Sequence, residues 1–107
     1  TPLPSAKALL PRISSDLGVR GPTIQRAISI IDKAQGLGLT CGKSPAGIAG
    51  AALYIASILE EDRRTQHDIA EAARITEVTI RNRYKQLVDT LKIKFSVSNS
   101  SVEESRL

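Results

Sequence analysis

Four residues near the C-terminal end of the chain have side chains that suit contact with the edges of base pairs. They are Val78, Arg81, Asn82 and Lys85. Successive spacings of three, one and three residues place them on one face of a helix. An Arg side chain can bind guanine through two hydrogen bonds, Asn can bind adenine in the same way, and a small apolar group can contact the methyl group of thymine. The pattern predicts a helix that reads the major groove of duplex DNA.

The apolar residues of the same segment indicate which face of this helix is buried. They repeat at helical spacing and are Ile80, Tyr84, Leu87, Val88 and Leu91. Val78 lies two residues before Ile80, which is about 200° around a helix of 3.6 residues per turn. Val78 is therefore expected to point outward, on the same side as Arg81.

Cationic and hydroxyl side chains around this helix could bind the phosphates of a DNA backbone. Residues 63–94 carry eight Lys and Arg residues against four Asp and Glu, and the whole chain has a net charge of +4. The positive excess is thus concentrated in one stretch, where the N-terminus of a helix at Thr65 would also favour an anion. The predicted phosphate contacts are Arg63, Arg64, Thr65, Thr79, Arg83, Lys92 and Lys94.

The elements that would position these side chains form a helix-turn-helix at about residues 65–91. Thr65 is a good N-cap for a short helix that ends near Ala73, and Thr76 is a good N-cap for the longer basic helix. The turn of such a motif often contains Gly, because the backbone adopts a positive φ there. Arg74 occupies the corresponding place, at a cost of about 1 kcal/mol if its backbone is left-handed.

Three further helices are expected before this motif, at residues 5–17, 22–35 and 44–59. Pro11 lies inside the first of them and predicts a kink or a restart. The third is apolar nearly all round, which is typical of a helix buried on most sides. The predicted buried stripe of the second helix consists of Ile24, Ala27, Ile28, Ile31 and Ala34.

Composition supports one all-α domain and excludes several classes of site. Aromatic residues make up 3% of the 107 residues, which suits packed helices better than a β-sandwich. Cys41 is the single cysteine, so an internal disulfide and a cysteine-based zinc site are excluded. The longest apolar run, residues 48–59, is too short to span a bilayer. Residues 96–107 are expected to form a disordered tail, and the absence of Met suggests a fragment of a longer protein.

Two longer motifs resemble a known family. Residues 43–57, KSPAGIAGAALYIAS, resemble the central helix of a cyclin-like repeat. Residues 64–70, RTQHDIA, and 76–84, TEVTIRNRY, resemble the end of the second such repeat. The family is archaeal transcription factor B with its eukaryotic counterpart, transcription initiation factor IIB, and the resemblance runs across about residues 4–94.

The resemblance implies a five-helix cyclin-like fold for residues 1–95 and a role as a general transcription initiation factor. The family binds TATA-binding protein on promoter DNA, and its second repeat reads the B recognition element, upstream of the TATA box, in the major groove. The base contacts of the family lie at positions that match Val78 and Arg81. RNA polymerase would be a partner through the full-length factor, whose zinc ribbon and first repeat are not in this sequence. The implied location is the archaeal cytoplasm, at the nucleoid, or the nucleus of a eukaryote.

Two other classes of function are alternatives to DNA binding. A cyclin-type protein-interaction module without DNA binding is the first alternative, and it would expose an apolar groove. An enzyme is the second, and the sequence argues against it because it has one histidine, no Gly-rich phosphate loop and no metal constellation. His67 is expected to face solvent rather than to bind a ligand. No cofactor, small-molecule substrate or membrane is expected as a partner.

Overall fold

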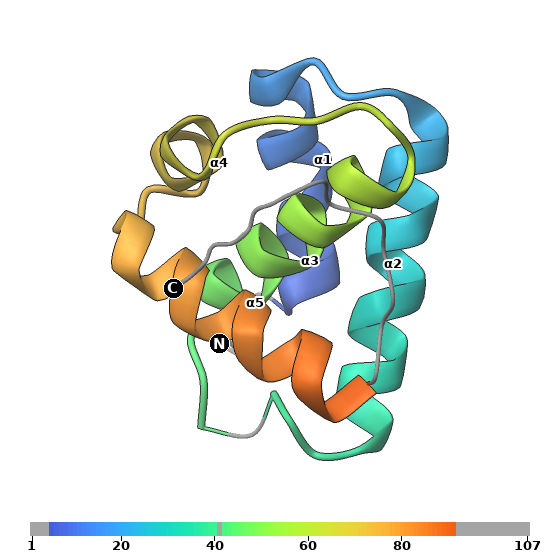
Figure 1. Ribbon diagram of the computed structural model, residues 1–107, viewed down its shortest axis with the longest axis vertical. Helices are drawn as coiled ribbons and strands as arrows, with labels where there is room; N and C mark the ends of the chain where they lie inside the picture. Colours follow the sequence, from blue (N-terminus) through green and yellow to red (C-terminus); the bar gives the residue numbers. More distant parts are fainter. Residues whose placement is uncertain (1–4, 41, 92–107) are drawn as a thin grey trace.

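The computed structural model describes residues 5–40 and 42–91, and within these ranges the chain forms five α-helices and no strand (Figure 1). The helices are α1 (Ala6–Leu17), α2 (Gly21–Gly36), α3 (Pro45–Leu59), α4 (Gln66–Ala73) and α5 (Glu77–Leu91). The prediction of an all-α, five-helix chain is confirmed. The expected tail at 96–107, together with Lys92 and Lys94, lies outside the described residues.

Helix α3 occupies the centre of the molecule, and the other four helices pack around it (Figure 1). Every residue from Gly47 to Ser57 is buried, as expected for a helix that is apolar on all sides. The small side chains of α3 let its neighbours approach closely. The largest fully buried apolar side chains of the molecule are Leu10, Ile13, Ile31, Ile48, Leu53, Ile55, Ile69, Ile80 and Leu87.

Four of the five helices begin at a side chain that accepts a hydrogen bond from the first turn. The pairs are Ser5 with the Ala8 amide, Ser44 with Gly47, Thr65 with Asp68, and Thr76 with Thr79. Each such cap contributes about 1 kcal/mol to helix stability. These caps fix the starts of α1, α3, α4 and α5 close to the positions predicted from the sequence.

Helix α1 runs without interruption through Pro11, so the predicted restart is wrong. Pro11 lacks the amide that would bond the carbonyl of Lys7, but both residues lie on the exposed side of α1, where water can solvate that carbonyl. The buried side of α1 is formed by Ala6, Leu10 and Ile13, which the proline ring does not disturb. Gly18 ends the helix with a φ of 70°, as expected for a C-cap glycine.

The buried face of α2 is displaced by part of a turn from the predicted stripe. Ile24 and Ile28 are only half-buried, whereas Thr23 and Ile30 are buried. Thr23 can be buried because its hydroxyl donates a hydrogen bond to the carboxylate of Asp62, 3.1 Å away. The observed stripe is Thr23, Ala27, Ile30, Ile31 and Ala34.

Candidate nucleic-acid interface

Helices α4 and α5 form the predicted helix-turn-helix, with Arg74, Ile75 and Thr76 between them. Arg74 is left-handed, with φ 62° and ψ 45°, at the place where the sequence suggested such a backbone. Its amide bonds the carbonyls of Ala70 and Glu71, and the next amide, of Ile75, bonds Ala70 at 2.9 Å. These bonds close the end of α4 and turn the chain directly into α5.

Two glycines of α3 determine how closely α5 approaches the centre of the fold. A Cβ atom placed on Gly50 would lie 2.6 Å from Cδ1 of Ile80, which is fully buried. A Cβ atom on Gly47 would lie 3.2 Å from Cγ2 of Thr79. The first turn of α5 therefore rests directly on the α3 backbone, and this contact holds the start of α5 firmly in place.

The face of α5 that points away from α3 carries the four residues predicted to contact bases. Val78 is 56% exposed, which is unusual for a large apolar side chain in this molecule. Arg81, Asn82 and Lys85 are also exposed. Neither Arg81 nor Lys85 forms an ion pair with any residue that the structure describes. The fold thus presents one apolar and three hydrogen-bonding side chains together on one open surface.

The residues predicted to bind phosphate are in several different environments. Arg63 and Thr65 are exposed beside the start of α4, although the Thr65 hydroxyl already caps that helix. Thr79 and Arg83 are half-buried on the side of α5 nearest to Gly47, and the Arg83 guanidinium donates to the side chain of Gln86 at 2.8 Å. Among the predicted cations that the structure describes, Arg63 is exposed, whereas Arg64 and Arg83 are half-buried.

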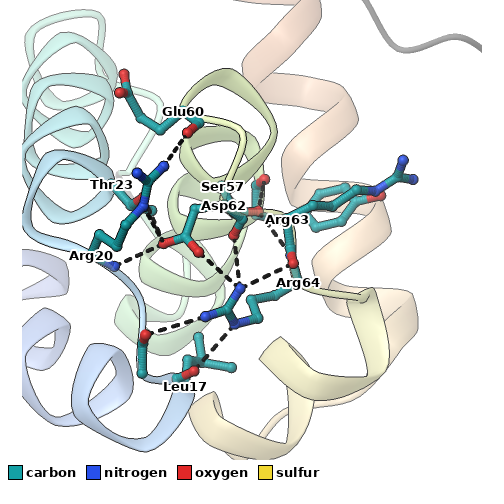
Figure 2. Close-up of polar contacts among 10 residues, drawn as sticks. Leu17, Arg20, Thr23, Ser57, Glu60, Asp62, Arg63 and Arg64 are labelled. Atoms are coloured by element: carbon teal, nitrogen blue, oxygen red, sulfur yellow. Dashed lines mark hydrogen bonds and ion pairs between the residues drawn. The ribbon is translucent and has the colours of Figure 1, made fainter.

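Arg64 is used inside the protein (Figure 2). Its guanidinium donates hydrogen bonds to the carbonyls of Leu17 and Gly18 at the end of α1, both at 3.2 Å. It also pairs with the carboxylate of Asp62 at 2.9 Å. The Arg63 side chain, by contrast, extends away from this network (Figure 2). The structure therefore gives Arg64 a role in fixing α1 to the segment before α4, which the sequence pattern did not reveal.

Asp62 is the centre of this network and also serves the start of α2. Its carboxylate accepts from the backbone amide of Arg20 at 2.8 Å, from Thr23 and from Arg64. The hydrogen bond from the Arg20 amide is the largest of the interactions that lower the pKa of the Asp62 carboxyl group. Asp62 thereby anchors the start of α2, which has no side-chain N-cap, to the segment between α3 and α4.

His67 faces solvent, as predicted, but it also joins the two helices of the motif. Its Nδ1 lies 3.2 Å from a carboxylate oxygen of Glu77 at the start of α5, and its Nε2 lies 3.5 Å from Glu71. The hydrogen bond to Glu77, followed by the charge of Glu71, raises the pKa of His67. The contact with Glu77 was missed, because residues ten apart cannot be paired from helical spacing alone.

An open cavity of about 390 Å³ lies between α1 and α4. Three of its lining residues, Asp16, Asp68 and Glu71, are acidic.

Within residues 5–40 and 42–91 there is no group of three or more His, Cys, Asp or Glu side chains that could hold a metal ion. None of the helices described is long and apolar enough to cross a membrane.

Comparison with known proteins identifies the family. The chain is 54% identical over 92 residues to a transcription initiation factor IIB of Saccharolobus shibatae, and this match covers 86% of the chain but 30% of the relative. The identity is 55% over 87 residues to the Pyrococcus furiosus factor, covering 81% and 29%. It is 60% over 85 residues to the Methanopyrus kandleri factor, covering 79% and 28%.

The chain therefore spans less than a third of the length of these curated relatives, all named transcription initiation factors. This naming agrees with the expectation that the chain is not an enzyme. The family profile described as "Transcription factor TFIIB repeat" matches residues 1–90, and thus nearly every residue of the five helices. The resemblance found in the sequence motifs is confirmed: the chain belongs to the transcription factor TFIIB repeat family.

Proposed function

We propose that this chain is the second repeat of an archaeal-type transcription initiation factor and that it binds promoter DNA through α5. The observation that carries the proposal is the exposed face of Val78, Arg81, Asn82 and Lys85 at the N-terminal half of α5. This face enters the major groove, where Arg81 reads a guanine and Val78 contacts a thymine methyl group. Its target is the B recognition element upstream of the TATA box.

Phosphate contacts flank the reading helix on both sides. Arg63 and Thr65 lie at the start of α4, and Thr79 and Arg83 lie on the opposite side of α5, near Gly47. A helix in the major groove has one backbone on each side, so this placement suits one contact to each strand. Arg64 is left out of the interface because its donors are bonded within the protein.

TATA-binding protein and, through the full-length factor, RNA polymerase are the proposed protein partners. The identity of the relatives supports this assignment, since all are transcription initiation factors. Such a factor works at the genomic DNA, so the proposed location is the nucleoid of an archaeal cell or the nucleus of a eukaryotic one. A single module buries little surface on DNA, so these partners supply the remaining affinity.

The proposal is tested by an NMR titration of the labelled chain with two short duplexes at the same salt concentration. One duplex carries a purine-rich B recognition element, and the other carries the same bases in scrambled order. We expect chemical-shift changes concentrated on residues 76–85 and larger for the first duplex. Equal, scattered changes at Lys and Arg residues would indicate phosphate binding only. An absence of changes at low salt would favour the protein-interaction module, and TATA-binding protein would be the next titrant.

The Arg81→Ala substitution tests base reading directly. We expect it to cost about 1–3 kcal/mol of binding free energy on the cognate duplex and to relax specificity at one base pair. Lys33→Ala removes an equal charge from the exposed side of α2 and should leave the cognate affinity nearly unchanged. Binding is measured by fluorescence anisotropy on duplexes that vary one base pair at a time. Equal weakening on every duplex would instead make Arg81 a phosphate contact.

A further inference from the structure

The helix-turn-helix has a small apolar cluster of its own, distinct from the main core. Its buried members are Tyr54, Ile69, Ala70 and Ile80. Tyr54 belongs to α3, and the other three belong to α4 and α5. The central helix therefore inserts Tyr54 between the two helices of the motif, and the partly buried Ile58 packs beside it.

The ring of Tyr54 contacts α5 through the ring of Tyr84. The ring centroids are 4.9 Å apart and the planes are inclined by 76°, an edge-to-face arrangement. Such a pair is directional, because the positive edge of one ring meets the negative face of the other. The contact therefore constrains the orientation of Tyr84 more narrowly than an aliphatic side chain would.

Tyr84 lies at the border between the buried and the exposed face of α5. It is half-buried, and its desolvation raises the pKa of its hydroxyl group. Arg81 lies three residues earlier, which is about 60° around the helix from Tyr84. Any rotation of α5 that moves Tyr84 off the ring of Tyr54 turns Arg81 through the same angle.

The hydroxyl group of Tyr54 reaches the other helix of the motif. The side-chain amide of Gln66, the first residue of α4, donates to this hydroxyl at 3.5 Å, a long hydrogen bond. Tyr54 thus contacts α5 through its ring and α4 through its hydroxyl. Tyr54 therefore connects both helices of the motif to α3.

We infer that Tyr54 and Tyr84 are positioning residues for DNA recognition, because their contact sets the rotation of α5 about its own axis. This inference rests on the proposed function and deepens it. A guanine contact through two hydrogen bonds requires the Arg81 guanidinium to be placed within a fraction of an ångström. The tyrosine pair contacts no base, and it acts by directing Val78 and Arg81 toward the groove.

The test compares three substitutions in the whole chain and keeps a fourth as a replacement for the first. Tyr84→Leu removes the aromatic contact but keeps an apolar side chain, and Tyr84→Met serves the same purpose should the leucine variant not fold. Tyr84→Phe keeps the ring. Ile31→Val, in the fully buried part of α2, is the control for a general loss of core packing. Three quantities are measured for each variant. They are its stability, the ratio of its affinities for the cognate and scrambled duplexes, and the orientation of α5 relative to α3, which is obtained from residual dipolar couplings of the free protein.

We expect Tyr84→Leu to reorient α5 and to lower the affinity ratio by about tenfold, the discrimination of one good base contact. Tyr84→Phe and Ile31→Val should keep the wild-type orientation and ratio. An unchanged orientation in Tyr84→Leu, with a loss of stability like that of Ile31→Val, would overturn the inference and reduce the pair to ordinary packing. If the wild-type protein bound the cognate and scrambled duplexes with equal affinity, the proposed function would be contradicted. The residual dipolar couplings of the free protein would still show whether Tyr84 sets the orientation of α5.

Discussion

The junction between α3 and α4 and the outer face of α5 contain similar charged side chains, but the fold uses them differently. At the junction, Arg20 and Arg64 pair with Asp62, and Arg26 pairs with Glu60. On the outer face of α5, Arg81 and Lys85 have no ion-pair partner among the described residues. A cation is available to a ligand only where the protein leaves its donors unused, and residue type alone does not show where that is.

Two adjacent arginines show the difference most clearly. The side chain of Arg64 is 26% exposed and donates to the end of α1, whereas Arg63 is exposed and points away from that network (Figure 2). The first stabilises the fold, and the second is free to meet a partner. The basic stretch that suggested DNA binding therefore contains residues of two kinds, and substitutions can separate them.

The largest expected effect is at the centre of the junction. Asp62→Ala should lower the free energy of unfolding by about 3 kcal/mol, because the side chain is 10% exposed and its loss leaves Thr23 and the Arg20 amide without their acceptor and Arg64 without its ion-pair partner. Urea denaturation measures this change. Asp32→Ala, which breaks an exposed ion pair with Lys7, is the matched control and should change stability by no more than about 1 kcal/mol.

The lowered pKa of Asp62 predicts how the stability of the protein changes in acid. Since folding lowers the pKa of Asp62, its contribution is fully present above the ordinary value of about 3.9 and is lost as the pH falls through the lower value of the folded state. The stability difference between wild type and Asp62→Ala should therefore shrink below pH of about 4. A constant difference down to strongly acid pH would show that the ionised form is not what stabilises the junction.

The next largest effect is expected beneath α5. Gly50→Ala forces Cδ1 of Ile80 out of a contact of 2.6 Å, which costs about 1–3 kcal/mol in a packed core. The better helix propensity of Ala returns about 1 kcal/mol, so the net loss should be about 1 kcal/mol. Gly36→Ala, with no atom within 4 Å, should gain stability or leave it unchanged. If thermal unfolding shows both variants stabilised, α5 does not rest closely on α3.

Smaller effects are expected from substitutions of Arg63 and Arg64, and the two residues should differ in which property changes. Arg63→Gln should leave the unfolding midpoint unchanged and reduce the slope of log K against log salt by about 0.9, the value for one phosphate contact. Arg64→Gln should lower the midpoint, because the carbonyls of Leu17 and Gly18 lose their donor. Both variants are compared in salt titrations of duplex binding. Reversed results for the two variants would mean that the junction and the interface have been assigned the wrong arginines.

The smallest effect is at the turn between α4 and α5. The raised pKa of His67 means that its bond to Glu77 stabilises the fold most fully below about pH 6.5, the ordinary value, and that this stabilisation is lost as the pH rises through the folded-state pKa. An NMR titration of the His67 ring should give a pKa that falls in the Glu77→Gln variant. Lys33→Gln, a change of charge at the exposed end of α2, should not move it.

Helical periodicity predicted most of the fold because each helix buries one face against a neighbour. The caps at Ser44, Thr65 and Thr76 placed the helix starts, and the 200° separation of Val78 from Ile80 placed the outward face of α5. The left-handed backbone was expected at Arg74 because a helix-turn-helix needs it there. These features depend on residues close together in the sequence.

The features that sequence reading missed depend on partners far apart in the chain. Thr23 and Asp62 are 39 residues apart, and Arg64 and Leu17 are 47 apart. No spacing rule connects such pairs, so a buried threonine was excluded from the core stripe and a structural arginine was assigned to phosphate. The contact of Tyr54 with Tyr84 was missed for the same reason.

The central position of α3 has a consequence for how the protein opens. Because α3 contacts all four other helices, we expect its buried backbone amides to reach water only when the whole domain unfolds. The amides of α4, a helix of eight residues at the edge, can exchange through local opening. Hydrogen exchange in the buried part of α3 should therefore report the global free energy of unfolding, and exchange in α4 should be faster.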